Sequence, residues 1–291
     1  MRKTALLLVI TLFIYILTGC TVTNQDVQIA ATTLPVYEFT SQLCKGTDIT
    51  VGRIVTESVS CLHDYTLQVS QMRMIEGADA VVISGAGLEE FLENVLTSSE
   101  VIIDASNGTH LHDGEEHHEY EAEHTHEVDP HIWLSPKNAQ IMVRNICKGL
   151  IEAYPQHQSI FENNKAILLD ELMLLQQYGE NELATLSCRN LVTFHDGFGY
   201  FAEAFDLMVL RAVEEESGSE ISAAELIELV NTVREHQLPA VFTEANGSTS
   251  AAEIICAETG IKMFTLNMAM AGDSYFDAMY HNIDTIKEAL E

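Results

Sequence analysis

The sequence predicts an α/β protein with two lobes, each with a mainly parallel sheet flanked by helices, joined by a long rigid helix. Short β-branched runs alternate with helical stretches in both halves of the chain, a pattern typical of parallel sheets covered by helices. A long stretch without glycine or proline separates the halves. With 291 residues, of which 47% are hydrophobic, the chain is large enough to bury two cores.

The strands and helices of the two halves follow each other in the same way. In the first half, strand-like runs at 80–84 and 101–104 alternate with helical stretches around 69–76 and 88–96. The second half repeats this alternation, with strand-like runs at 191–194, 207–210, 240–243 and 262–266 and helical segments that include 222–236 and 250–259.

The connecting helix is predicted over residues 155–186. No glycine or proline occurs between Pro155 and Gly179, and apolar residues recur at helical spacing, namely Phe161, Leu168, Leu172 and Leu175. We therefore expect an N-terminal lobe over 28–154 and a C-terminal lobe over 187–291. The alternative is an ordinary helix within one continuous domain, because the pattern does not show which lobe the helix packs on.

The N-terminus predicts export. Two basic residues precede an apolar run over residues 5–17, which is too short to span a bilayer comfortably. The run ends in Leu-Thr-Gly-Cys at residues 17–20, which resembles the lipobox of bacterial lipoproteins. We expect residues 1–19 to be a signal peptide and Cys20 to carry lipid, with 20–27 as the tether of an extracytoplasmic, membrane-anchored domain. An ordinary cleaved signal with a chance cysteine is the alternative.

The chain is strongly acidic, with a formal net charge of −30 at pH 7. Removal of the signal takes away two basic residues, which makes the charge about −32. Such a surface repels nucleic acid, so nucleic acid is excluded as a partner. The charge raises the local concentration of cations, although a role in solubility alone explains it equally well.

A histidine-rich acidic segment occupies residues 110–126. It contains six histidines interleaved with glutamates, and such a composition cannot build a core. We expect a mobile loop that binds a transition metal weakly and passes it inward, since imidazole is largely neutral near pH 7. A solvated insertion without a role is the alternative. The histidines are His110, His112, His117, His118, His124 and His126.

Three further histidines stand at the ends of predicted elements. His63 lies in a polar break before a helix, His131 follows Asp-Pro, and His195 follows the strand-like run 191–194. Residues that follow parallel strands converge in one crevice, so the three imidazoles are candidate ligands of one metal ion. Taken singly, each histidine is better explained as a hydrogen-bonded structural residue than as a ligand.

The segments around these histidines resemble the zinc- and manganese-type solute-binding proteins of bacterial ABC importers. Residues 60–91 resemble the first ligand segment of that family, and Asp-Pro-His-Ile-Trp-Leu at 129–134 resembles the second. His-Asp-Gly-Phe-Gly-Tyr-Phe at 195–201 resembles the third, and 273–282 resembles the closing helix. Each motif alone is a weak signal, whereas the four together extend over most of the chain.

The resemblance implies a metal site in the cleft between the lobes, with His63, His131 and His195 as ligands. It also implies capture of the metal outside the cell membrane and delivery to a membrane permease by a monomeric protein. Manganese-type members generally carry a carboxylate where His195 stands, and imidazole suits zinc. We therefore expect Zn²⁺ as the transported ligand, with Mn²⁺ or Fe²⁺ as the alternative within the same family.

The fourth ligand position departs from the family pattern. Many relatives place an aspartate after the last strand, where this chain has Asn267. An amide oxygen is a weaker zinc donor, so water, a histidine of the loop or Glu244 are alternatives for this position. Glu244 is also explained by a hydrogen bond between the lobes.

Two function classes other than metal capture, a zinc enzyme and a surface adhesin, are alternatives for this sequence. Three histidines with an open position also describe a catalytic zinc site, but the chain has no His-Glu-x-x-His motif and no identifiable set of nucleophile, base and oxyanion donor. We therefore expect no enzyme activity. A surface adhesin is the other class, as an added role. No phosphate-binding Gly-x-x-x-x-Gly-Lys motif occurs, so the protein itself would not hydrolyse ATP.

Five cysteines remain after Cys20, so at least one is unpaired. Cys44 and Cys61 flank a strand-like segment and form the best candidate disulfide. Ligation of the metal by the Cys61 thiolate is the minor alternative.

Overall fold

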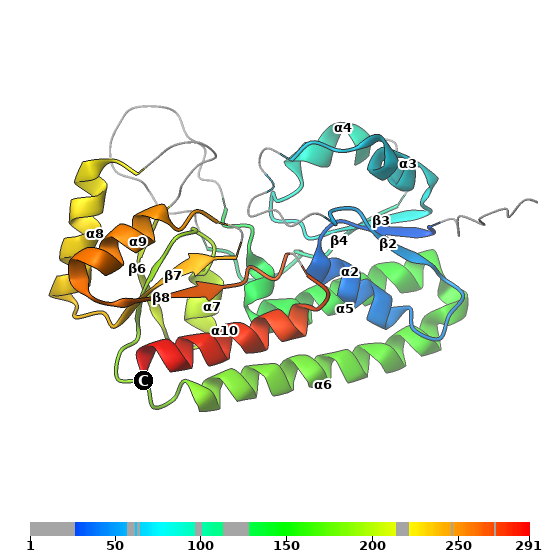
Figure 1. The fold of residues 1–291 in the computed structure, drawn as a ribbon. Helices are drawn as coiled ribbons and strands as arrows, with labels where there is room; N and C mark the ends of the chain where they lie inside the picture. The colour runs from blue at the N-terminus through cyan, green and yellow to red at the C-terminus, as the bar shows by residue number, and fades with distance from the viewer. Residues whose placement is uncertain are drawn as a thin grey trace, which may run out of the picture.

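The structure is a computed structural model that describes residues 27–56, 62, 65–96, 101–112, 128–213, 221–245, 247–270 and 272–291. The predicted fold class is confirmed, because the described chain forms two four-stranded parallel sheets with helices on both faces (Figure 1). Several predicted residues lie outside the described ranges: Cys20, Cys61, His63, His117, His118, His124 and His126.

The first lobe is built on strands in the order β2-β1-β3-β4. The strands are β1 (Ile29–Ala31), β2 (Val51–Arg53), β3 (Ala80–Ile83) and β4 (Ile102–Asp104). The helices α3 and α4 lie on one side of this sheet, and α2 and α5 lie on the other (Figure 1). They are α2 (Leu34–Leu43), α3 (Val69–Gly77), α4 (Glu93–Leu96) and α5 (Pro136–Ala153), with 3₁₀ turns η1 (Glu90–Leu92) and η2 (Ile132–Leu134).

The second lobe repeats this strand order as β6-β5-β7-β8. The strands are β5 (Asn190–Thr193), β6 (Met208–Ala212), β7 (Ala240–Glu244) and β8 (Lys262–Leu266), and the helices are α7 (Gly199–Ala204), α8 (Ala223–Glu235), α9 (Ser250–Thr259) and α10 (Tyr275–Leu290). Side chains alternate across this sheet, as strand geometry requires. Val192 and Val241 pack with α8 and α9, whereas Leu191 and Phe242 belong to the main core on the other face.

Helix α6 (Gln158–Glu182) follows the short turn η3 (Pro155–His157) and extends along both lobes (Figure 1). Its 25 residues span about 38 Å. It packs against α2 and α5 of the first lobe and against α10 of the second. Gly179 lets the helix approach the ring of Phe205, because a Cβ atom at this position would lie 2.3 Å from Phe205 Cε1. Among the described residues, no helix is both long and apolar enough to cross a membrane.

The two lobes share one hydrophobic core, and two buried aromatic residues connect them by hydrogen bonds. The Trp133 indole N–H donates to the carbonyl of Met268 at 2.8 Å, and the Tyr275 hydroxyl donates to the carbonyl of Trp133 at 2.8 Å. Both side chains are fully buried. The Glu38 carboxylate accepts the backbone N–H of Tyr275 at 2.5 Å. These bonds hold the lobes in a defined relative position.

Cys44 is a free cysteine at the C-cap of α2. It is 4% exposed and packs in the main core, where a thiol behaves as a small apolar group. Its predicted partner Cys61 lies outside the described residues, and the predicted disulfide between Cys44 and Cys61 is not formed in this structure.

The predicted helical stretch 88–96 is only partly helical, because the chain first turns around the buried carboxylate of Glu89. This carboxylate accepts hydrogen bonds from the Thr32 hydroxyl at 2.7 Å and from the backbone N–H groups of Ser84 and Gly85 at 2.7 and 3.0 Å. The 3₁₀ turn η1 and the short α4 follow. Burial raises the pKa of Glu89 to about 7, although the three hydrogen bonds oppose this change.

The raised pKa of Glu89 makes stability depend on pH. The folded chain binds the proton of Glu89 more tightly than the unfolded chain. The stability that this proton contributes is therefore complete at a pH below 4.5, the ordinary pKa of the group, and is lost as the pH rises to about 7. Relative to Glu89→Gln, the free energy of unfolding of the wild type should fall by on the order of 3 kcal/mol from about pH 4.5 to 7.5. Urea unfolding measures this difference, with the exposed neighbour Glu90→Gln as the control. A difference that stays constant with pH would contradict the assignment.

Candidate metal site

Two of the three predicted ligands, His131 and His195, meet between the lobes. His131 immediately precedes η2 in the first lobe, and His195 follows the carboxyl end of β5 in the second. Their Nε2 atoms lie 3.3 Å apart, with ring centroids 5.0 Å apart and ring planes at 86°. The third predicted ligand, His63, lies outside the described residues.

A carboxylate fixes each imidazole from the side opposite to the other ring. Asp129 Oδ1 lies 2.8 Å from His131 Nδ1, and Glu244 Oε2 lies 3.0 Å from His195 Nδ1. Each contact favours the tautomer in which the carboxylate accepts the Nδ1 proton and Nε2 carries the lone pair. In that tautomer the two Nε2 lone pairs face each other across 3.3 Å, an arrangement that favours a cation between them.

The separation of the two nitrogens fits a tetrahedral zinc ion. Two nitrogen ligands that each lie 2.0 to 2.1 Å from such an ion are roughly 3.4 Å apart. His131 is 7% exposed, and its burial lowers its pKa, although the hydrogen bond to Asp129 opposes this change. The ring is therefore neutral near pH 7, the form that binds a metal.

Asp129 is a positioning residue that was not predicted from the sequence. Its Oδ1 atom accepts both the backbone N–H of His131 at 2.9 Å and the Nδ1 proton of the same residue. The signal was present in the sequence as Asp-Pro-His, since aspartate often accepts the N–H two residues further along the chain.

Glu244 and Asn267 are the two candidates for a fourth ligand. Glu244 is the last residue of β7, which pairs with β5, and Asn267 follows β8, which pairs with β7. Glu244 contacts the Nδ1 side of His195 rather than the Nε2 side. The side-chain oxygen of Asn267 accepts the backbone N–H of Ala269 at 2.8 Å, within the turn after β8. Both side chains therefore have other partners in this structure.

Close packing at the site requires a glycine at position 197, two residues after His195. A Cβ atom at this position would lie 2.5 Å from Met268 Cε, 2.9 Å from His131 Nδ1 and 2.9 Å from His195 Cδ2. Only a residue without a side chain lets the loop after β5 close over both rings. The motif at 195–201 thus has a packing requirement at the site itself.

The fold and this histidine pair define a two-lobed metal-binding protein. Residues 29–289 match the family model described as zinc-uptake complex component A, periplasmic (ZnuA), and the chain belongs to this family.

Curated relatives agree with the family assignment. The chain is 31% identical over 262 residues to a protein of Treponema pallidum (strain Nichols) whose name refers to metal binding, covering 86% of this chain and 83% of that one. It is 29% identical over 288 residues to the high-affinity zinc uptake system protein ZnuA of Bacillus subtilis (strain 168), covering 92% and 88%. It spans only 55% of the length of the zinc-binding protein AdcA of Streptococcus pyogenes that it also matches.

Solved structures show the same fold. A crystal structure of ZnuA superposes with a TM-score of 0.78 at 28% identity, covering 91% of this chain and 100% of that chain.

Substitution of Gly197 tests the packing at the site. Gly197→Ala should displace one or both imidazoles and lower the affinity for zinc by about tenfold to 100-fold, the range for lost ligand orientation. Isothermal titration calorimetry measures this affinity. Gly77→Ala is the matched control, because nothing lies within 4 Å of a Cβ atom there. Equal affinities in the two variants would show that the close packing of Gly197 on the rings does not affect the ligands.

Proposed function

We propose that this protein captures zinc between its two lobes outside the cytoplasm and delivers it to the membrane permease of an ABC importer. One observation carries the proposal: two imidazole Nε2 atoms from different lobes lie 3.3 Å apart, and a carboxylate contacts the Nδ1 atom of each ring. Membership of a family described by zinc uptake supports the transport role.

Zinc is the proposed cargo because the facing donors are nitrogens. Imidazole suits zinc, whereas manganese favours oxygen donors. The two carboxylates near the site do contribute oxygens, but they contact the Nδ1 atoms, away from the facing Nε2 atoms. This arrangement favours zinc over the manganese alternative.

We assign the third position to His63 and the fourth to water. Asn267 and Glu244 are the weaker candidates for the fourth position, because each already has a partner for its side-chain oxygen. A site with three imidazoles and one exchangeable water retains an open position, which suits a protein that must release its ion.

The proposal includes the predicted anchor. Removal of residues 1–19 and lipid attachment at Cys20 would hold the protein at the outer side of the cell membrane, with 20–27 as a tether. There it would act as a monomeric binding protein and not as an enzyme.

Zinc binding by ligand variants of the mature chain tests the function. The wild type should bind one zinc tightly and prefer it to manganese. His131→Ala and His195→Ala should each weaken this binding by more than about 100-fold, since loss of orienting groups alone reaches that range. Competition dialysis measures both quantities. The exposed His281→Ala is the control. Tight zinc binding that persists in the double variant His131→Ala, His195→Ala would refute the proposed site.

Trp133 offers an independent optical test, because it is the single tryptophan of the chain. Its ring centroid lies 5.4 Å from that of His131, and its side chain is fully buried. Zinc bound to His131 places a dication beside the indole, so tryptophan emission should change until one zinc per chain is bound. The change should disappear in His131→Ala and persist in His281→Ala. Unchanged emission during tight zinc binding would place the ion elsewhere.

A further inference from the structure

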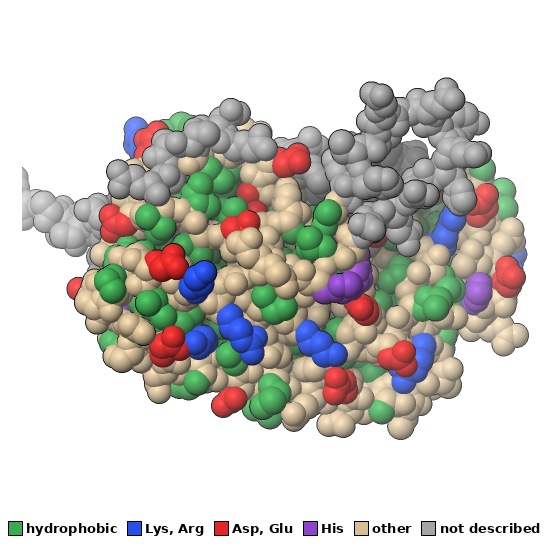
Figure 2. Space-filling model, turned by 180° about the vertical axis from the view of Figure 1, so that it is seen from behind, with side chains coloured by type: hydrophobic (Ala, Val, Ile, Leu, Met, Phe, Trp, Pro, Cys, Tyr) green, Lys and Arg blue, Asp and Glu red, His purple; other side chains and the backbone are tan. Residues whose placement is uncertain are grey.

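A row of basic side chains lies on the helical side of the first lobe, in a chain that is strongly acidic overall. The sequence has 44 acidic and only 14 basic residues. On α5, however, the exposed positions are Lys137, Arg144, Lys148 and Glu152, so three of the four carry positive charge. Figure 2 shows Lys and Arg side chains in a row across this lobe, which runs toward histidine side chains at the second lobe.

The row follows one stripe of α5 and continues onto α6. Lys137, Arg144 and Lys148 are separated by seven and four residues, a spacing that places them on the same side of a helix. Lys165 adds a fourth cation, because α6 packs along α5. A hollow of about 190 Å³ between the two helices brings Arg144, Lys148 and Lys165 to one place. We call these four cations the basic face.

The basic face keeps an excess of positive charge. Two carboxylates, those of Glu152 and Glu162, also line the hollow, and Glu162 forms an ion pair with Lys165. Four cations therefore stand against two carboxylates, although the whole chain has a formal charge of −30. An anionic partner is attracted here, whereas the chain as a whole repels it.

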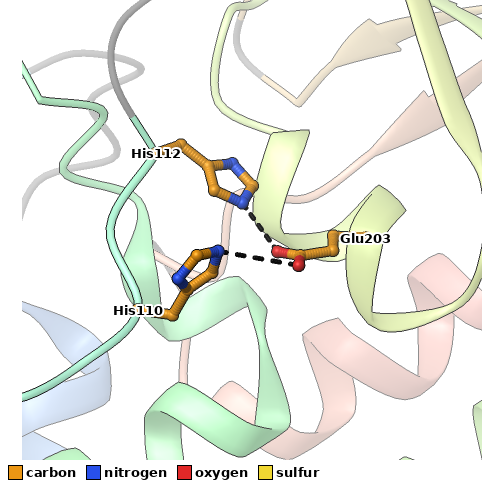
Figure 3. Close-up of side chains that lie close together, drawn as sticks. All are labelled: His110, His112 and Glu203. Carbon is orange, nitrogen blue, oxygen red and sulfur yellow. Dashed lines mark hydrogen bonds and ion pairs between the residues drawn. The ribbon is translucent and has the colours of Figure 1, made fainter.

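The basic face ends where α5 meets the second lobe. Asn138, in the first turn of α5, donates to the carbonyl of His110 at 2.9 Å. The Nε2 atoms of His110 and His112 lie 3.6 and 2.6 Å from the carboxylate oxygens of Glu203, on α7 of the second lobe (Figure 3). The row of cations thus stops at an acidic residue and belongs to the first lobe alone.

The proposed tether begins beside the same helix. The carbonyl of Gln28 accepts the backbone N–H of Asp79 at 2.9 Å, and the Asp79 carboxylate accepts the hydroxyl of Tyr154, the C-cap of α5, at 3.2 Å. Fully extended, residues 20–27 span at most about 29 Å. The 18 residues of α5 are about 27 Å long. A membrane that holds Cys20 is therefore within reach of the whole row.

We propose that the basic face binds the anionic lipid headgroups of the membrane that carries the anchor. The inference rests on the proposed anchor for the position of that membrane. Each Lys or Arg at an anionic membrane surface strengthens binding by about fivefold, and a short tether keeps the local concentration high enough for a weak contact to form. The negative charge elsewhere on the chain is screened beyond about 8 Å at physiological salt. An acidic partner protein would fit the same charges, but the membrane is the surface that the tether itself brings near.

The test uses the mature chain joined at residue 20 to a synthetic lipid, so that it does not depend on lipid attachment in the cell. The chain is bound to vesicles of phosphatidylcholine, alone or mixed with phosphatidylglycerol, and a membrane-impermeant acylating reagent labels its lysines. On the anionic vesicles Lys137 and Lys148 should react at least about fivefold more slowly than on the neutral ones. The exposed Lys262 of the second lobe should react at the same rate on both.

Matched variants and salt complete the test. Arg144→Gln with Lys148→Gln should remove the protection of Lys137, whereas Arg211→Gln with Arg234→Gln, on the second lobe, should preserve it. Salt at about 1 M should also remove the protection, because it shortens the screening length to about 3 Å. Equal labelling of Lys137 on the two kinds of vesicle would overturn the inference and leave an acidic protein as the partner. A Cys20 without lipid in the cell, measured by mass spectrometry, would instead refute the anchor and not the affinity of the basic face for anionic lipid.

Discussion

The hydrogen bonds of Trp133 and Tyr275 set the distance between the two lobes, and the histidine pair depends on that distance. His131 lies two residues before Trp133, whose indole bonds to the carbonyl of Met268 in the other lobe. Met268 in turn packs beside Gly197, which contacts both imidazole rings. The residues that join the lobes and the residues that face the metal position thus form one continuous set of contacts. A shift of Trp133 relative to Met268 would therefore change the separation of the Nε2 atoms of His131 and His195.

Parallel sheets with the same strand order account for the position of the candidate ligands. In the second lobe, β5, β7 and β8 lie side by side in this order. Glu244 is the last residue of β7, and His195 and Asn267 follow the ends of β5 and β8. The site therefore uses strand ends as rigid supports, while His131 comes from the short segment before η2. One ligand of the described pair belongs to each lobe, which makes the pair sensitive to their relative position.

The sequence predicted the features that depend on local pattern or on motifs, and it missed those that depend on packing. Alternating strands and helices, and His131 and His195 as neighbours, followed from element ends and family motifs. Strand β1 was not predicted, because it consists of Ile29 and two alanines, and alanine is not a typical strand residue. The contact of Glu203 with His112 could not be predicted for a different reason, because it arises only when α7 of one lobe meets the segment after β4 of the other.

The two carboxylates behind the histidines also have a consequence for charge balance. Asp129 and Glu244 are largely buried and bring two negative charges to a pair of neutral rings. A dication held between the rings would cancel these charges, whereas a monovalent ion would leave one buried charge uncompensated and a trivalent ion would add one of opposite sign. Uncompensated charge is costly in a buried setting, and the group formed by these two rings and two carboxylates is electrically neutral only with an ion of charge two.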